Sequence, residues 1–374
     1  MQCDPIRNVN LLEFSPLLLQ TDPSTSIQNA LAPLAPLVQY PTMVLLGIVL
    51  ALLAIAYAIG QYLQRQPESI ITPAVVKSFN RRVQAWWMLY AILGLTLLIS
   101  QLWPSIGRLP ATLFFFGISF WALREFITLT LTRLGDHRAL FWVFFVIAPL
   151  QYLLVALGDQ EYNFGTETTW ISTKRLFANL IPVYAFLFIP ARTAMAGDHK
   201  RFLERTSKIQ AGLMVCVFAL SHAPALLDLR LTSTDGSAWR QGNAGLLLFF
   251  ILVVQMSDVF QFVWNHTAGK RTIAPAINET RTWEGFTGGV VCSIVLGTAL
   301  YWVTPFNPLQ AAMMGALLGV MGFAGSMTMS AIKRDRGVQD YGTLVEGHVG
   351  VLDRFDSICF AAPVFYHITS FLFT

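Results

Sequence analysis

The feature that most constrains this chain is a series of apolar runs, each about 20 residues long, that recurs along nearly its whole length. A helix of about 20 residues crosses the roughly 30 Å hydrocarbon core of a bilayer and satisfies its own backbone hydrogen bonds there. Hydrophobic residues make up 55% of the chain and charged residues only 12%, about half the usual fraction in a soluble domain. The sequence therefore predicts an all-α, polytopic integral membrane protein.

Windows of apolar residues predict a bundle of about ten transmembrane helices (nine or ten). We expect them near residues 42–63, 83–103, 109–131, 139–157, 176–195, 209–229, 244–264, 285–304, 309–329 and 356–374. With the N-terminus outside, eighteen of the 25 Lys and Arg residues fall in inside loops and six in outside segments. Cytoplasmic loops carry an excess of these residues, so the asymmetry predicts that both termini lie outside.

The remaining composition narrows the class of protein. The net charge of +4 is too small to indicate binding to nucleic acid. The first 41 residues lack the basic start and apolar stretch of a secretory signal, and we interpret them as an ordered or loosely docked leader. The simplest expected location is the bacterial inner (cytoplasmic) membrane.

A polar inside segment, residues 330–357, interrupts the apolar pattern just before the last span and concentrates groups that bind phosphate and metal. Its cations Lys333 and Arg334 suit a polyphosphate. Asp353 and Asp356 are three residues apart at the start of a helix, so they share one face, and carboxylate oxygens suit Mg²⁺. The alternative is a loop whose cations only follow the positive-inside rule.

This segment resembles the signature of the phosphatidate cytidylyltransferases, or CDP-diacylglycerol synthases. Ten residues stand at matching positions without a gap: Ser330, Lys333, Arg334, Asp340, Gly342, His348, Gly350, Asp353, Arg354 and Asp356. Three positions depart from the family pattern. They are Gln339 in place of Lys, Glu346 in place of Pro or Gly, and Val349 in place of Gly.

A second stretch supports the resemblance independently. Residues 278–289 are similar to a family block that contains Thr-Trp-Glu-Gly and ends in Gly-Gly, with Arg281 keeping one of its two cations. Ser257-Asp258 and the residues up to Pro275 resemble the block just upstream. The detailed resemblance covers roughly residues 257–357. We therefore divide the chain into an N-terminal leader with two additional transmembrane helices (1–104) and a cytidylyltransferase-like membrane domain (105–374).

The resemblance implies transfer of CMP from CTP to phosphatidic acid, giving CDP-diacylglycerol and pyrophosphate for phospholipid biosynthesis. It implies Mg²⁺ as the cofactor, membrane lipids as surroundings and a homodimer as an assembly to consider. The catalytic residues would be Lys333, Arg334, Asp340 and Asp353, and the substrate-binding residues Arg281, Trp283, Glu284, His348 and Arg354. The metal ligands would be Asp258, Asp340, Asp353 and Asp356.

Several polar residues have two interpretations. Asp258 lies about six residues, or roughly 9 Å, inside its span. It is either a metal ligand or the partner of a neighbouring cation. Glu284 either orients a metal-bound water or caps a helix. We interpret Arg124 and Glu125 as a mutual buried pair, and the Gly315–Gly319 spacing as close helix packing.

Three alternatives to phosphatidate cytidylyl transfer remain. The first is a cytidylyltransferase or CTP-dependent kinase that acts on another lipid, for which Gln339 and the additional helices would be natural marks. The second is a catalytically weak paralogue with a scaffold role. The third is a transporter, which would need ionisable residues along several spans, whereas only four qualify: Arg124, Glu125, Asp228 and Asp258.

Overall fold

The structure is a computed structural model that describes residues 41–64, 73–102, 106–129, 133–163, 170–233, 236–239, 242–338 and 350–374. These residues belong to one compact unit, Pro41–Thr374. The predicted leader lies outside the described residues. The described part is helical throughout, apart from loops and two short hairpins.

Ten long helical segments make up the described part, as the apolar runs predict. They are α3 (Pro41–Gln64), α4 (Pro73–Leu102), α5 (Leu109–Thr128), α6–η3–α7 (His137–Leu157), α8–η4–α9 (Thr173–Ala194), α10–η5–α11–η6 (Phe202–Asp228), α12 (Ala244–Thr267), α13 (Trp283–Ala299), α14 (Pro308–Asp335) and α15 (Leu352–Phe373). The segments η3 (Val143–Ile147), η4 (Leu180–Ala185) and η5 (Leu213–Ala219) are π-helical. Helices α4 and α14 extend beyond their apolar windows because charged Lys and Arg residues are good helix formers in water.

The hydropathy of these segments identifies a polytopic helical membrane protein. Seven of them, among the described residues, are long and apolar enough to cross a membrane: α5, α6–η3–α7, α8–η4–α9, α10–η5–α11–η6, α12, α14 and α15. Helices α3 and α4 contain shorter apolar stretches, Pro41–Ile55 and Trp86–Ser100, and α13 has 17 residues. The orientation relative to the two sides of the membrane stays a prediction.

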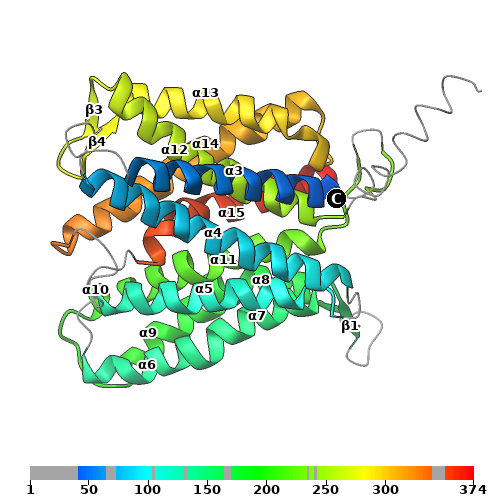
Figure 1. Ribbon diagram of the computed structural model, residues 1–374. Helices are drawn as coiled ribbons and strands as arrows, with labels where there is room; N and C mark the ends of the chain where they lie inside the picture. Colours follow the sequence, from blue (N-terminus) through cyan, green and yellow to red (C-terminus); the bar gives the residue numbers. More distant parts are fainter. Residues whose placement is uncertain are drawn as a thin grey trace, which may run out of the picture. The chain divides into compact units, whose positions relative to one another are not determined.

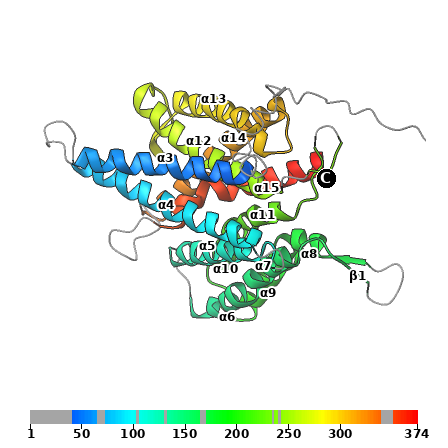
Figure 2. The ribbon, with the colours of Figure 1, turned by 45° about the vertical axis from the view of Figure 1, so that its right-hand side comes forward.

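Helix α15 lies between two groups of helices (Figures 1 and 2). It packs against α12 and α14 on one side and against α5 and α11 on the other. Helices α13 and α14 approach so closely that a Cβ at Gly315 would stand 2.4 Å from the Ser293 carbonyl oxygen. The packing interpretation of Gly315 is thereby confirmed, since only a residue without a side chain fits there.

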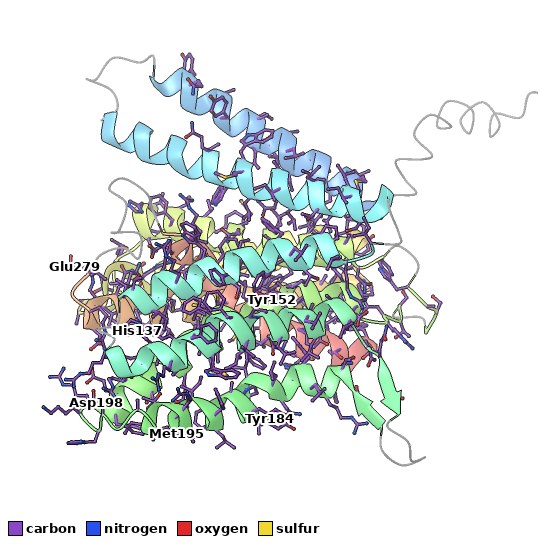
Figure 3. The ribbon with its side chains drawn as sticks, turned by 90° about the horizontal axis from the view of Figure 1, so that it is seen from below. His137, Tyr152, Tyr184, Met195, Asp198 and Glu279 are labelled. Carbon is purple, nitrogen blue, oxygen red and sulfur yellow. The ribbon has the colours of Figure 1, made fainter. Side chains whose placement is uncertain are left out.

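Loops gather at two opposite ends of this bundle (Figure 1). The hairpin of β3 (Thr272–Ala274) and β4 (Asn278–Thr282) joins α12 to α13 at one end, which we call the β3–β4 end. The hairpin of β1 (Glu161–Asn163) and β2 (Trp170–Ser172) stands at the other end. Figure 3 shows His137, Asp198 and Glu279 at the same end, so the loops before α6, before α10 and within the β3–β4 hairpin share it.

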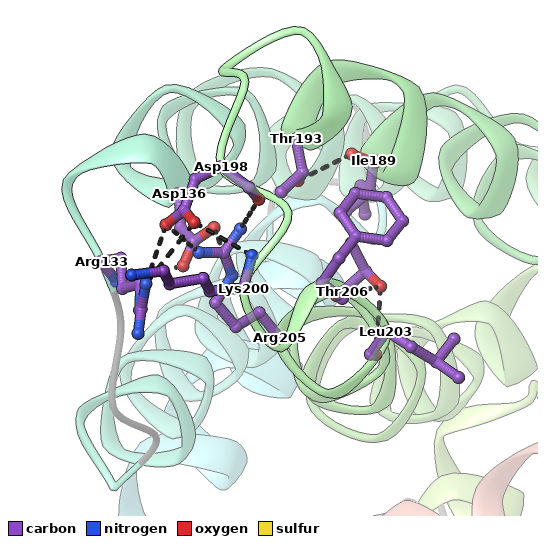
Figure 4. A network of polar contacts seen from close by, with 10 residues as sticks. Arg133, Asp136, Ile189, Thr193, Asp198, Lys200, Leu203, Arg205 and Thr206 are labelled. Atoms are coloured by element: carbon purple, nitrogen blue, oxygen red, sulfur yellow. Dashed lines mark hydrogen bonds and ion pairs between the residues drawn. The ribbon is translucent and has the colours of Figure 1, made fainter.

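Two ion-paired arginines tie loops together at the β3–β4 end (Figure 4). Arg205 on α10, with 5% of its side chain exposed, contacts Asp198 at 2.5 Å and Asp136 at 3.4 Å. Arg133 contacts Asp198 at 3.2 Å, and the backbone amide of Lys200 also donates to the Asp198 carboxylate at 3.1 Å. Asp198 therefore links the α9–α10 loop to the start of α6 and to α10.

This network generates a prediction about pH. The hydrogen bond from Arg205, with smaller contributions from Lys200 and Arg133, lowers the pKa of Asp198 from its usual 3.8 to about 2. A carboxylate with a lowered pKa stabilises the fold above its unfolded-state pKa and loses that contribution as the pH falls through its folded-state pKa. We expect Asp198→Asn to lower the thermal unfolding midpoint at neutral pH, with the difference from wild type closing between about pH 4 and pH 2.

The matched control is Glu204→Gln, which removes a carboxylate that is 43% exposed and pairs with Lys208 one turn away, and which should change the midpoint much less. Thermal unfolding in detergent across this pH range measures both variants. A difference between wild type and Asp198→Asn that stayed constant down to pH 2 would contradict the role of Asp198.

Candidate active site

The candidate site is built on a stripe of polar side chains along one face of α12. Gln255, Asp258, Gln261 and Asn265 follow one another at intervals of three, three and four residues, which places them on the same side of a helix. Only Asp258 was predicted as a site residue. Polar residues at helical spacing within an otherwise apolar span are a signal that identifies the other three.

Asp258 lies at the centre of the site. Its Oδ2 accepts a hydrogen bond of 2.5 Å from the Ser357 hydroxyl on α15, and its Oδ1 lies 3.8 Å from the Arg281 guanidinium. Oδ1 is buried and accepts no hydrogen bond from the described residues. The carboxylate therefore has a cation as its neighbour and one oxygen that accepts no hydrogen bond from the described residues. Its role as a metal ligand stays a prediction.

Two further carboxylates come from the first turns of α15. Asp356 Oδ1 accepts hydrogen bonds from the Ser357 amide at 2.7 Å and from the Ser357 hydroxyl at 3.3 Å. Ser357 therefore bridges Asp356 and Asp258. Asp353, one turn earlier, contacts Lys333 Nζ of α14 at 2.8 Å. Ser357 was not predicted, although it directly follows the signature.

Arg281 reaches the same place from strand β4. Its Nη1 donates to Gln261 Oε1 at 2.7 Å, and its Nη2 donates to the Ser326 hydroxyl on α14 at 2.6 Å. These contacts fix the guanidinium beside Asp258. Because the cation is held by neutral acceptors on two helices, its charge is only partly offset by the carboxylate 3.8 Å away.

The residues that open α13 organise the hairpin. Glu284 Oε2 accepts hydrogen bonds from the amides of Lys270 and Arg271, both at 3.1 Å, so its carboxylate holds the chain that enters β3. The expected cap of α13 is instead Thr282, whose hydroxyl accepts from the Gly285 amide at 3.1 Å. The interpretation of Glu284 as the helix cap was therefore wrong, since a side chain at the second helical residue reaches the preceding loop more easily.

Three further predicted residues, the substrate-binding candidates Trp283 and Arg354 and the catalytic candidate Arg334, lie within the described residues. Trp283 exposes 53% of its surface. Arg334 donates from Nε to the Ile277 carbonyl at 3.2 Å, which ties α14 to the hairpin. Arg354 on α15 accepts through its backbone carbonyl from Gln255 Nε2 at 2.9 Å.

Asp340 and His348 lie outside the described residues, as does Gln339. Among the residues that the structure describes, no group of three His, Cys, Asp or Glu side chains stands together at metal-binding distances. The donor set nevertheless suits a hard cation. Asp258 and Asp356 are two carboxylates joined through Ser357, and Asp258 Oδ1 is a buried oxygen without a hydrogen-bond partner among the residues described.

The expected ion pair between Arg124 and Glu125 is wrong. Consecutive residues on a helix point about 100° apart and do not face each other. Arg124 is exposed, and its guanidinium lies 5.2 Å from the centre of the Trp121 ring. Glu125 is buried and accepts hydrogen bonds from the amides of Val351 and Leu352, at 3.0 and 2.9 Å.

With this geometry in view, the comparison with known proteins identifies the class. The sequence pattern of the cytidylyltransferase family matches residues 80–372, from within α4 almost to the end of α15. The chain belongs to this family, and the resemblance seen in the signature residues is confirmed. The matched range includes every described residue of the candidate site.

The chain is similar to curated proteins of two kinds. It is 37% identical to the uncharacterized protein YnbB of Escherichia coli (strain K12) over 290 residues, 76% of this chain and 85% of that protein. It is 33% identical to a phosphatidate cytidylyltransferase of Staphylococcus haemolyticus (strain JCSC1435) over 129 residues, only 34% of this chain and 50% of that protein. A phosphatidate cytidylyltransferase of Staphylococcus saprophyticus is 24% identical over 261 residues, 69% of this chain and 89% of that protein.

The close approach of α14 and α15 at this site is open to test. A Cβ at Gly325 would stand 2.6 Å from the Asp356 carbonyl oxygen and 3.0 Å from Phe360 Cβ. We expect Gly325→Ala to push the two helices apart and to lower the free energy of unfolding by about 1–3 kcal/mol, the usual cost of overpacking. Thermal unfolding in detergent measures the change.

Gly322→Ala is the matched control one turn earlier on the same helix, because its Cβ would meet Ser357 Cβ and Val254 Cγ1 at an ordinary 3.6 Å. This variant should unfold within about 0.5 kcal/mol of wild type. Equal unfolding of the two variants would show that α14 and α15 are not in the contact described.

Proposed function

We propose that the protein transfers CMP from CTP to phosphatidic acid, giving CDP-diacylglycerol and pyrophosphate. The proposal rests on one observation: in a member of the cytidylyltransferase family, Arg281, Lys333 and the carboxylates Asp258, Asp353 and Asp356 meet from four different elements at the β3–β4 end. The names of the staphylococcal relatives supply phosphatidate as the acceptor.

For this reaction the protein has to supply fixed charges close to the phosphates more than groups that form covalent bonds with the substrates. A phosphate oxygen of phosphatidic acid attacks the α-phosphorus of CTP, and the bond from that phosphorus to the oxygen shared with the β-phosphate breaks, so pyrophosphate leaves with the electron pair. Both substrates and the leaving group are anionic. Arg281, Lys333 and Arg334 would contact their phosphates and offset this charge.

Mg²⁺ is the cofactor that this charge balance calls for. Asp258, Asp353 and Asp356, together with Asp340 of the signature, would hold it. Bound there, the metal supplies Lewis-acid stabilisation of the phosphate oxygens. The Ser357 hydroxyl orients Asp258, the Ser357 amide holds Asp356, and Lys333 orients Asp353.

The proposed location of the site follows from its two substrates. CTP arrives from water, whereas the acyl chains of the lipid stay in the bilayer. At a polar site at one end of the spans, CTP can bind from water while the acyl chains of the lipid remain in the bilayer. Because the inside loops hold most of the cations, the proposal places this end on the cytoplasmic face of a bacterial inner membrane.

A second candidate is the same chemistry on another lipid phosphate, or a CTP-dependent lipid kinase. Two observations favour it. Gln339 stands where the family signature has Lys. Moreover, the 37% identity to YnbB extends over 290 residues, longer and higher than the identity to the two staphylococcal phosphatidate cytidylyltransferases named above. A scaffold role for a weak paralogue would be favoured by CTP binding without turnover.

The test is transfer of radiolabel from CTP to lipid by the purified protein with phosphatidate and Mg²⁺. We expect Asp353→Asn and Asp258→Asn each to lower the rate by on the order of 100-fold or more, since each removes a charge that acts on the phosphates through metal or lysine. Asp335→Asn is the matched control, because Asp335 lies on the same helix as Lys333, is 67% exposed and pairs only with neighbouring Arg336 among the contacts described.

Each result has a distinct meaning. Label in lipid from wild type and from Asp335→Asn, and none from the two site variants, supports the proposal. Label that enters a lipid extract but not phosphatidate identifies another acceptor, and CDP released from CTP identifies a kinase. Nucleotide that binds without any turnover contradicts an enzymatic function.

A further inference from the structure

Glu125 is a buried carboxylate in the last turn of α5, outside the set of residues that the family signature identifies. Three donors surround it. The amide of Val351 and the indole Nε1 of Trp121 both donate to Oε1 at 3.0 Å, and the amide of Leu352 donates to Oε2 at 2.9 Å. Two of these donors are Val351, which directly precedes α15, and Leu352, its first residue, 226 and 227 positions further along the chain.

This contact supplies what the sequence of α15 lacks. The first amides of a helix have no partner within the helix, and they carry partial positive charge. The residue that precedes α15 is Val351, which has no side-chain oxygen and makes no capping hydrogen bond. A carboxylate delivered from α5 fills that position and neutralises the positive end of α15.

The capped turn carries the site. Asp353 follows Leu352 directly, and Ser357 lies five residues after Leu352, about 7.5 Å along the helix axis at 1.5 Å per residue. Gln255 of α12 holds the same turn through the Arg354 carbonyl at 2.9 Å. Because a helix moves as a rigid element, a contact that fixes the start of α15 contributes to the position of Asp353, Asp356 and Ser357 relative to Asp258 and Lys333.

We propose that Glu125 is a positioning residue of this site: it anchors the N-terminus of α15 and so holds the carboxylates of α15 in register with Asp258 and Lys333. The effect on catalysis rests on the proposed function, whereas the anchor itself does not. The anchor also accounts for a carboxylate buried in a membrane span, because three hydrogen bonds and the end of a helix offset the cost of its burial.

The experiment compares Glu125→Ala, Glu125→Gln and the matched control Arg124→Ala in the full-length protein. Hydrogen–deuterium exchange of the peptide that covers residues 350–357 reports the anchor, and steady-state transfer from CTP reports the site. We expect Glu125→Ala to exchange faster in that peptide and to lose on the order of 100-fold in kcat, the loss that a misplacement of about 1 Å can cause, with the KM for CTP changed by less than about threefold.

Glu125→Gln keeps one acceptor oxygen and the size of the side chain, so it should fall between wild type and Glu125→Ala in both readouts. It also decides the question if the alanine variant does not fold. Arg124→Ala, one residue away on the exposed side of α5, should match wild type.

Two results would overturn the proposal. One is unchanged exchange at residues 350–357 in both Glu125 variants, which would exclude the anchor. The other is faster exchange with wild-type kcat, which would exclude a positioning role. A wild-type protein without cytidylyl transfer would overturn the proposed function alone, and the exchange measurement would then decide the anchor by itself.

Discussion

The polar side chains of α12 must form their hydrogen bonds with other parts of the bundle. The hydrocarbon of the bilayer has no hydrogen-bonding groups, and an unpaired polar group there costs several kcal/mol. Gln255 is paired with the first turn of α15, Gln261 with Arg281, and Asn265 with the entry to α13. Satisfying this stripe therefore brings strand β4, α13 and α15 together around Asp258. The need to pair these polar groups, which stabilises the fold, therefore also assembles the candidate site.

The first turns of α15 are the most heavily constrained part of that assembly. Three helices hold them: α5 through Glu125, α12 through Gln255 and Asp258, and α14 through Lys333 and the close contact at Gly325. Charges that are fixed before a substrate arrives cost no reorganisation during reaction, which is the usual source of electrostatic catalysis. This arrangement suits transfer between two phosphates, where positioning and charge do most of the work.

Much of this organisation was readable from local patterns. The ten helices follow from runs of apolar residues, and the cytidylyltransferase signature identified the segments that carry Lys333, Asp353 and Asp356. Arg281 and Asp258 were found through a second block of resemblance. Local patterns failed where a side chain acts on a distant part of the chain: Glu125 was assigned to its neighbour Arg124, Glu284 was considered as a cap of its own helix, and Ser357 and the glutamines of α12 were not considered at all.

The sequence by itself therefore determined the class of protein, the number and approximate limits of its helices and the family to which it belongs, because each of these depends on spacings within a span or a short motif. Only the tertiary structure decided which polar groups meet. The partner of Glu125 lies 226 residues away, and those of Asp258 come from a strand and from the last helix. Such pairings follow from how helices pack. No local periodicity in the sequence predicts how far two neighbouring helices are shifted relative to each other along their axes.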